Sequence, residues 1–412
     1  MLTKLRVKGF KSLRDLEIDL PRLTVLFGPN ASGKSNVLEA TQMLARSATA
    51  RTLADASGEA IPGHPLEVFA FPQSGLPELL KQRAASFELE ADLRAETENL
   101  TYRIGVQIQP GAGALSVQDE YLTRLTKSGE PRSEAARIER VGDKLHVRQK
   151  NRPGHPWQDK VGQNHSCLSE LRYSGSQYVT LDRCRSEFDA WRVYYLDPRV
   201  AMRSARPPAD VHDIGVLGED IAPFLYRLEG EAEDRFAAVK RTLRSVIPSV
   251  EDMAVDLDDK RGTLDILVTQ DGCSFPSRII SEGTLRVLAL CAIAVDPWAK
   301  GLVAFEEPEN GVHPRRLELI AQLIVSLALE QERQVIVTSH SPLFCREVLR
   351  LTRERRSDAQ LLAVRREAGA TVVAPIEYPD GLFEDDELRS SLTSPTEDGV
   401  FEAMLLRGWL DE

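Results

Sequence analysis

The sequence predicts an α/β fold, because three apolar strand patterns each lead into polar residues that carry chemistry. Residues 23–27 lead into a glycine-rich turn, residues 301–305 into two carboxylates, and residues 335–337 into a segment that contains a histidine. Helical patterns lie at residues 36–44 and 285–294. β-Branched runs that alternate with helical patterns are typical of a sheet covered by helices. We therefore expect a mixed sheet that presents these polar residues at its strand ends.

Length and composition set the class of protein. The chain has 412 residues, enough for two or three domains. Its 42% hydrophobic and 28% charged content is typical of soluble proteins, and its net charge of −11 excludes a surface that is basic throughout. The five cysteines occur singly, which favours reduced thiols over disulfides or zinc. Since no apolar run is long enough to cross a bilayer, we expect a cytoplasmic protein without a membrane anchor.

The motifs divide the chain into a predicted head and a predicted insertion. Residues 1–44 and 250–375 carry the motifs and form the head, and residues 45–249 are inserted between them. Residues 376–412 form an acidic tail that ends in an amphipathic helical pattern. The acidic run at residues 384–387 is interpreted as solvent-exposed, with metal binding as the alternative.

The predicted insertion contains several kinds of segment. Alternating apolar and polar residues predict an antiparallel β meander over residues 86–148. Basic loops extend over residues 131–206, a short strand is predicted at residues 191–196, and a helical segment at residues 219–247. Because no window sustains consecutive heptads, no long coiled coil is expected.

Residues 28–35 read Gly-Pro-Asn-Ala-Ser-Gly-Lys-Ser and form a phosphate-binding loop between a strand and a helix. Glycines let the backbone N–H groups point at phosphate oxygens, and the next helix adds its positive N-terminal end. Lys34 is expected to reach the β- and γ-phosphates, and the Ser35 hydroxyl to bind Mg²⁺. The sequence therefore predicts a nucleoside triphosphate site. The residues expected to contact the nucleotide are Gly28, Asn30, Ser32, Gly33, Lys34, Ser35 and Asn36.

Two carboxylates follow the strand at residues 301–305. Glu306 is placed to hold Mg²⁺ through water or Ser35, and Glu307 is placed to orient the attacking water. The alternative is that both carboxylates simply face solvent.

Two further segments add residues of the same kind. Ser281 and Gly283 begin a helix, whose N-terminal end favours anions, and His340 ends a strand pattern. Ligands of α/β sheets bind at such strand ends. The alternatives are an ordinary N-cap and a structural histidine.

In this order, the motifs resemble those of the ABC-type ATPases, in the branch that includes SMC proteins, RecF and the overcoming-lysogenization-defect (OLD) ATPases. The resemblance is closest to OLD-like ATPases without a Toprim domain, and residues 5–13 are also similar to the start of these proteins. It implies an ABC-ATPase head, a mixed sheet lobe with helical and β insertions. The matching segments are GPNASGKS (28–35), ISEGT (280–284), GLVAFEEPENGVHP (301–314) and TSHSP (338–342).

The resemblance implies a slow, Mg²⁺-dependent ATPase in which two heads dimerise and share two ATP sites. Ser281 and Gly283 would form the signature motif, which contacts ATP held by the second copy. Glu307 would be the catalytic glutamate and His340 the switch histidine at the γ-phosphate. Asn310 would lie in the D-loop, which crosses the dimer interface.

The sequence departs from the family pattern at two places. Glu306 stands where aspartate is commoner, which bears on the magnesium assignment, and the signature reads SEGT instead of S-G-G-Q. Gln42 and Gln109 are both candidates for the Q-loop glutamine, and neither has a distinctive context.

Three cellular roles fit such an ATPase. The first is an OLD-like switch in nucleic-acid surveillance of the anti-phage kind. The residues that follow His340 are too few for a Toprim nuclease, so a separate effector protein is expected. The second is a RecF-like DNA-repair clamp that binds DNA or RNA through the basic residues 131–206. The third is a nucleotide-gated scaffold or sensor without nuclease activity.

Overall fold

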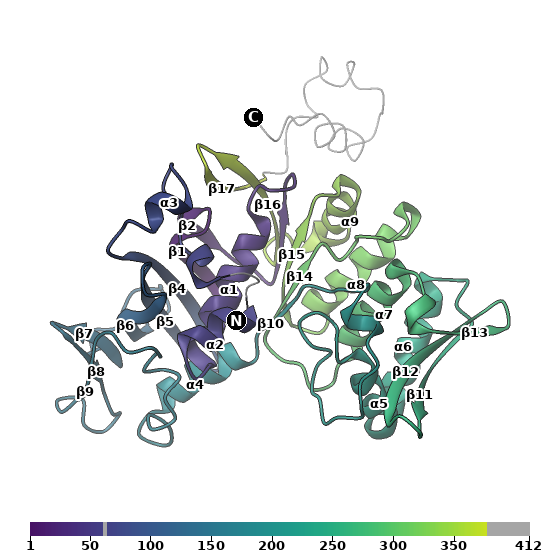
Figure 1. Ribbon diagram of the computed structural model, residues 1–412, viewed down its shortest axis with the longest axis horizontal. Coiled ribbons are helices and arrows are strands. Elements are labelled where there is room, and N and C mark those ends of the chain that lie inside the picture. The colour runs from purple at the N-terminus through teal and green to yellow at the C-terminus, as the bar shows by residue number, and fades with distance from the viewer. Residues whose placement is uncertain (61–63, 377–412) are drawn as a thin grey trace, which may run out of the picture. The chain divides into compact units, whose positions relative to one another are not determined.

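The computed structural model describes residues 1–60 and 64–376, which form two compact units (Figure 1). The predicted acidic tail and its terminal helix lie outside the described residues, apart from Ile376. The first unit comprises residues 1–21, 29–191 and 364–374, and the second comprises residues 22–28, 192–363 and 375–376 of the described chain.

The boundaries of these two units differ from the boundaries of the predicted head and insertion. The first strand, β1 (Leu2–Phe10), pairs with β4 (Ala85–Ala95) of the meander, so both belong to the first unit. In contrast, β3 (Leu23–Phe27) pairs with strands of the second unit. The phosphate loop therefore begins in one unit, at Gly28, and continues in the other. The division into a motif-bearing head and an insertion remains a prediction.

The first unit is built on an antiparallel sheet of eight strands, in the order β2-β1-β4-β5-β6-β7-β8-β9. It contains the antiparallel strands predicted for the meander. Along β4, every second side chain is buried, as expected for a sheet with one face in the core. The other strands are β2 (Leu13–Asp19), β5 (Glu98–Gln109), β6 (Ala114–Leu125), β7 (Ile138–Val141), β8 (Lys144–Val147) and β9 (Trp157–Lys160).

Helices cover this sheet, and the phosphate-loop helix is central among them. Helix α1 (Lys34–Thr49) contacts β1, β4, α2 (Leu53–Ala60) and α4 (Val179–Asp189). The short helix α3 (Leu76–Leu79) also belongs to this unit. Twelve of the sixteen residues of α1 are buried, so the helix is fixed by packing over most of its length.

A buried carboxyl group joins the meander to the segment before α4. Glu120 of β6 accepts hydrogen bonds from the backbone N–H groups of Cys167 (2.6 Å) and Leu168 (2.9 Å). The Tyr102 hydroxyl donates a third bond to it at 3.1 Å. Burial raises the pKa of Glu120 to about 7, although these hydrogen bonds oppose the shift.

The second unit contains the parallel strands β10-β14-β15-β3 and the first part of β16, in that order. The end of β16 and nearly all of β17, the next strand in the sheet order, belong to the first unit. The strand predicted at residues 191–196 is the three-residue β10. Gly28 follows β3, Glu307 follows β14 and His340 follows β15, so these residues lie at the same edge of the sheet. The bounds are β10 (Arg192–Tyr194), β14 (Leu302–Glu306), β15 (Gln334–Ser339), β16 (Ala359–Glu367) and β17 (Ala370–Pro375).

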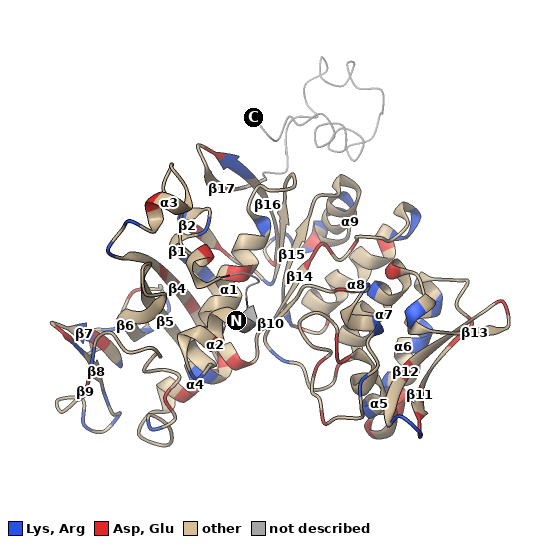
Figure 2. Cartoon of the chain, in the orientation of Figure 1, with Lys and Arg blue, Asp and Glu red and all other residues tan. Residues whose placement is uncertain are grey.

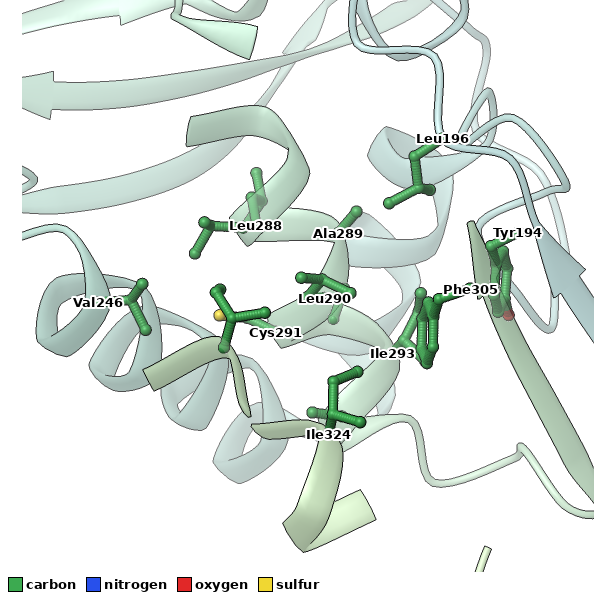
Figure 3. Packing of buried hydrophobic residues seen from close by; sticks show 14 of the residues in the cluster. Tyr194, Leu196, Val246, Leu288, Ala289, Leu290, Cys291, Ile293, Phe305 and Ile324 are labelled. Carbon is green, nitrogen blue, oxygen red and sulfur yellow. The ribbon is translucent and has the colours of Figure 1, made fainter. Parts of the chain in front are cut away.

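The core of the second unit forms where α7 (Glu282–Val295) packs between the sheet and other helices (Figure 3). Leu288, Cys291 and Ile293 of α7 lie among Val246 of α6 (Glu233–Val246), Ile324 of α8 (Leu317–Leu329) and Phe305 of β14. The rings of Phe305 and Tyr194 stack with centroids 5.8 Å apart. Each fully buried apolar side chain of this size contributes about 1.5–3 kcal/mol. Helix α7 is therefore held firmly, which fixes its N-terminus in place.

The predicted helical segment at residues 219–247 forms two helices that are separated at Ala232. A small antiparallel sheet, β11-β12-β13, contacts these helices. The remaining bounds are α5 (Ile221–Glu231), α6 (Glu233–Val246), β11 (Asp252–Asp258), β12 (Thr263–Gln270), β13 (Cys273–Pro276), α8 (Leu317–Leu329) and α9 (Pro342–Thr352).

The lengths of the helices and the distribution of charge concern the described residues. Within residues 1–60 and 64–376, no helix is long and apolar enough to cross a membrane. The same part of the chain contains no long coiled coil, since its longest helix, α1, has only 16 residues. Lys and Arg are interspersed with Asp and Glu along the chain (Figure 2), so the negative net charge is not confined to one segment.

Candidate nucleotide-binding site

The phosphate loop has the backbone conformation that its glycines predict. Gly33 has a φ of +104° and directly precedes α1, whose N-terminus receives no side-chain cap from any described residue. Lys34 is buried and its ammonium group donates to the Pro29 carbonyl at 2.9 Å. The Ser32 hydroxyl is buried and has no hydrogen-bond partner among the described residues. An unsatisfied buried hydroxyl in this loop fits a ligand that supplies oxygen acceptors, such as a phosphate group.

Three hydroxyl and amide side chains fix this loop inside the first unit. The Ser12 hydroxyl lies 2.6 Å from the Thr371 hydroxyl and accepts a 2.6 Å hydrogen bond from the Asn36 amide. The Thr371 hydroxyl donates to the Ser32 carbonyl at 2.9 Å. A Cβ on Gly33 would lie 2.0 Å from the Thr371 hydroxyl oxygen, so glycine is required here for packing as well as for its φ.

A cavity of about 520 Å³ adjoins this network in the first unit. Ser12 and Asn36 line it, so it opens directly beside the start of α1. Its wall combines cationic and aromatic side chains, which suits a charged ligand with a flat ring. These side chains are Lys11, Arg14, Phe69, Phe71 and Arg366.

In the second unit, the predicted catalytic residues are in contact. His340 Nδ1 lies 3.1 Å from Glu307 Oε1, and the Asn310 amide donates to Glu307 Oε2 at 2.6 Å. Glu307 has a φ of +44°, which is rare for a residue with a side chain. Its N–H is held by the carbonyl (3.1 Å) and the hydroxyl (3.2 Å) of Thr338 in the neighbouring strand. The turn thus aims both oxygens of the carboxylate at fixed partners.

Another acidic residue of the same turn, Glu309, is buried. The Ser339 hydroxyl donates to one of its oxygens, while the other oxygen has no hydrogen-bond partner among the described residues. Burial raises the pKa of the Glu309 carboxyl. Because Ser339 directly precedes His340, this contact ties the turn after β14 to the end of β15.

The residues of the predicted signature motif form the N-terminus of α7. Ser281 caps the helix, and its hydroxyl accepts from the Thr284 N–H at 3.1 Å. Gly283 lies against Gly311 so closely that a Cβ on it would be 2.2 Å from the Gly311 carbonyl oxygen. The signature motif and the turn that contains Asn310 therefore meet through backbone, and a side chain at residue 283 would separate them.

Arg286 of α7 is a cation that interacts with the carboxylates of this region. The pKa of Arg286 is lowered by burial of its guanidinium, while nearby carboxylates act in the opposite direction. These carboxylates are Glu282, Glu309, Glu307 and Glu306. Arg286 therefore partly compensates the negative charge that the acidic turn concentrates.

The arginines of the basic segment near residue 200 also contact the signature motif. Arg203 donates to the Ile280 carbonyl at 2.6 Å, and Arg199 Nε lies 2.7 Å from a carboxylate oxygen of Glu282. Both contacts are internal to the second unit. The sequence suggested a nucleic-acid surface for this segment, whereas the structure places two of its arginines at the start of α7.

Comparison with protein families identifies the chain. Residues 23–346, well over half of it, match the model of a family described as "AAA domain, putative AbiEii toxin, Type IV TA system". The chain belongs to this AAA-domain family. A comparison with curated proteins finds no match.

Solved structures show that this AAA-domain protein has the fold of an SMC head. The structure titled "Crystal structure of the SmcHead bound to the C-winged helix domain of ScpA" aligns with a TM-score of 0.54 at 15% identity, covering 93% of this chain and 99% of that chain. An SMC head from Pyrococcus furiosus, with an extended coiled coil and bound to the C-terminal domain of ScpA, aligns with a TM-score of 0.50 at 12% identity, covering 94% and 99%. The predicted fold class, a mixed α/β head without a long coiled coil, is confirmed for the described residues.

The structure brings together some of the predicted site residues of this AAA-domain protein. Glu307, Asn310 and His340 are in contact, and Gly283 packs beside the turn that carries Asn310. Asn30 is exposed on the phosphate loop, and Glu306 is half-buried at the end of β14. The joint assignment of Ser35 and Glu306 to Mg²⁺ remains a prediction.

The structure does not distinguish the two candidates for the Q-loop glutamine, and it reveals two contacts that the sequence did not predict. Gln42 is buried within α1 and Gln109 is exposed at the end of β5, so their positions do not single out either as the Q-loop glutamine. Sequence reasoning missed Thr371, which contacts the phosphate loop from the far end of the described chain. It also gave Ser12 no role, although the opening segment was noted as similar to the family.

Proposed function

We propose that this protein is a Mg²⁺-dependent ATPase with slow turnover that works as a head-to-head dimer with two shared ATP sites. The observation that carries the proposal is the contact of Glu307 with Asn310 and His340 at the carboxyl edge of the parallel sheet. Family membership and the SMC-head fold support a nucleotide-binding ATPase. This geometry adds a fixed carboxylate of the kind that phosphoryl transfer to water requires.

Different residues of the chain bind different parts of ATP and its metal ion. Backbone N–H groups of residues 30–36 and the N-terminus of α1 bind the phosphates, and the Lys34 ammonium neutralises part of their charge. The unsatisfied Ser32 hydroxyl donates to a phosphate oxygen. Ser35 and Glu306 would hold Mg²⁺, which would supply positive charge to the phosphates.

Glu307 orients the attacking water. Its carboxylate accepts a hydrogen bond from that water and takes its proton as the new phosphorus–oxygen bond forms. The γ-phosphoryl group leaves ADP, whose β-phosphate oxygen retains the electron pair of the broken bond. His340, 3.1 Å from Glu307, donates to a γ-phosphate oxygen and reports to Glu307 whether that phosphate is present.

The dimer acts as a switch, because its signature residues contact ATP of the second copy only in the closed state. We assign the switch to an OLD-like role in nucleic-acid surveillance of the anti-phage kind, with a separate effector protein. The family description, which names a toxin of a toxin–antitoxin system, supports a defence role. The SMC heads with this fold are titled as bound to ScpA, which supports a protein partner on such a head.

Substitution of Glu307 tests the proposal. Glu307→Gln keeps the size and the hydrogen bond from Asn310 but cannot accept the proton. We expect ATP binding to persist, hydrolysis to fall by about 10²-fold or more, and ATP-dependent dimers to accumulate in gel filtration with light scattering. If the Gln variant hydrolyses ATP and dissociates like the wild type, the role of Glu307 is wrong.

A DNA clamp is the second candidate function, and one observation favours it. The first unit contains a cavity of about 640 Å³ whose lining includes Arg137, His146, Arg148 and Lys150 from the predicted basic loops. Arg137 and Arg148 also pair with Glu134 and Glu139 respectively. A clamp would bind DNA or RNA with ATP and lose affinity steeply as salt rises. Absence of binding in low-salt gel-shift assays would exclude it and favour the third candidate, a nucleotide-gated scaffold.

A further inference from the structure

A short segment before α5 forms a rigid projection beside the signature motif. The Asp197 carboxylate accepts from the N–H groups of Arg199 (3.0 Å) and Val200 (3.2 Å), which closes a tight turn. The next residues, Ala201 and Met202, are buried in the second unit. Since the turn is closed on one side and anchored on the other, Arg199 and Val200 are held outward in a defined position.

This projection is attached to the signature motif at two points. Arg203 donates to the carbonyl of Ile280, the residue before the Ser281 cap. Arg199 pairs with Glu282, which stands between the two predicted nucleotide-contacting residues of the signature, Ser281 and Gly283. A displacement of this projection would therefore be transmitted to the signature motif.

The exposed surface of this region is unusual for a free protein face. The side chains of Arg199 and Glu282 are 76% and 44% exposed, yet they form a direct ion pair. The apolar residues Val200 and Ile279 are 69% and 64% exposed. Val200 directly precedes the short helical turn Ala201–Arg203, which contacts the turn Ser277–Ile279. Neighbouring exposed apolar side chains that flank a charged centre are typical of a surface that binds a partner.

We propose that Arg199 is a trans-acting arginine: in the ATP-bound dimer it leaves Glu282 and binds the phosphates of the nucleotide in the phosphate loop of a second copy. Val200 and Ile279 are buried in the same contact. The inference rests on the proposed ATP-bound dimer and names a residue that completes its shared site. Without ATP, Glu282 holds Arg199 beside the signature motif; with ATP, the phosphates replace Glu282.

Charge and exposure explain why this exchange is favourable. The ion pair of Arg199 with Glu282 is solvent-exposed and therefore weak, so Arg199 leaves Glu282 at little cost. A polyphosphate offers several oxygens with a greater charge, and the planar guanidinium binds two of them at once. Loss of the γ-phosphate removes part of that advantage, and Glu282 then competes successfully for Arg199. The exchange therefore makes the dimer contact sensitive to hydrolysis.

Single variants test the role of Arg199. We expect Arg199→Ala to weaken ATP-dependent dimerisation at least about tenfold, while ATP binding to the monomer stays unchanged. Arg199→Lys restores only part of the loss, because lysine lacks the planar fork. Glu282→Gln removes the competitor and strengthens ATP-dependent dimerisation by about two- to fivefold. Arg261→Ala is the matched control, since Arg261 of the same unit is 75% exposed and pairs with Asp258.

A mixed dimer tests whether Arg199 acts in trans. A Lys34→Ala chain loses its own nucleotide but keeps Arg199, and an Arg199→Ala chain keeps its phosphate loop. With ATP, the Lys34→Ala chain alone is not expected to dimerise, and the Arg199→Ala chain alone is expected to dimerise only weakly. A labelled Lys34→Ala chain should associate with Arg199→Ala in ATP, because that pair contains one complete site, and lack of association overturns the trans role.

The outcomes separate this inference from the function on which it rests. If the wild type neither dimerises with ATP nor hydrolyses it, the proposed function is wrong. If the wild type does both and Arg199→Ala behaves like Arg261→Ala, the function stands and only the role of Arg199 is overturned.

Discussion

The hydroxyl groups of Ser12 and Thr371 lie 2.6 Å apart, and each also contacts the phosphate loop or the first turn of the helix that follows it. Thr371 reaches the Ser32 carbonyl and leaves no space for a side chain at Gly33. Asn36, in the first turn of α1, donates to Ser12. The loop is thus fixed before ATP arrives, which lowers the entropy cost of binding.

Removal of one hydroxyl tests this support. We expect Thr371→Val, which keeps the shape, to weaken ATP binding about tenfold and to lower the free energy of unfolding by about 1–3 kcal/mol, because buried partners lose their hydrogen bonds. Thr371→Ser keeps the hydroxyl and should bind ATP almost as the wild type does. Titration with a fluorescent ATP analogue measures the first effect and chemical denaturation the second. Unchanged ATP affinity in Thr371→Val would show that the loop needs no such support.

The close approach of Gly283 to Gly311 predicts a sensitive position. In Gly283→Ala, the added Cβ meets the Gly311 carbonyl, so the turn that carries Asn310 must move. We expect a loss of about 1–3 kcal/mol in the free energy of unfolding and at least a tenfold loss of ATP turnover. Gly230→Ala is the matched control, because residue 230 lies in helix α5 with open space around it and alanine favours helices. Equal behaviour of the two variants would contradict the importance of the backbone contact.

The contact between His340 and Glu307 predicts a defect in catalysis more than in binding. We expect His340→Ala to lower kcat at least about tenfold while the KM for ATP changes little, since the phosphate loop keeps its own contacts. Steady-state phosphate release measures both constants. His212→Ala is the control, because His212 contacts Arg227 elsewhere in the same unit. A rise in KM at constant kcat would assign His340 to ground-state binding instead.

Glu120 predicts a pH dependence of stability. Its pKa is about 7 in the folded protein, above the usual carboxyl value of about 4.5, so the folded state holds a proton that the unfolded state has lost. Stability is therefore expected to fall as pH rises from about 4.5 to 7, by up to about 3 kcal/mol from this group alone. Urea unfolding of the wild type and of Glu120→Gln at several pH values checks this. The Gln variant should lack this part of the slope, and an identical slope in both proteins would refute the assignment.

Local patterns in the sequence predicted those parts of the fold and site that depend on neighbours in the chain. The phosphate loop, the carboxylates after β14 and the histidine after β15 each follow a buried strand, and the parallel order of these strands places their ends together. The pairing of β1 with β4 was not predictable, because an alternating pattern does not specify which strand it pairs with.

The parts of the site that the sequence did not predict depend on long-range polar contacts. Nothing near Thr371 in the sequence indicates a contact with residue 32, and the cost of closing so long a loop is met only by the completed fold. Arg199 and Arg203 lie in a segment whose composition suggests an extended basic surface. Their actual partners, Glu282 and the Ile280 carbonyl, lie about eighty residues away and are specified by packing, which composition does not encode.

The support from Thr371 also has a consequence for the order of events during synthesis. Ser12, Ser32 and Asn36 leave the ribosome early, whereas Thr371 follows only after more than three hundred further residues. While those residues are being made, the growing chain carries the whole phosphate-loop sequence without the strand that holds it in shape. We therefore expect high-affinity ATP binding only after Thr371 has been made and has folded against the loop.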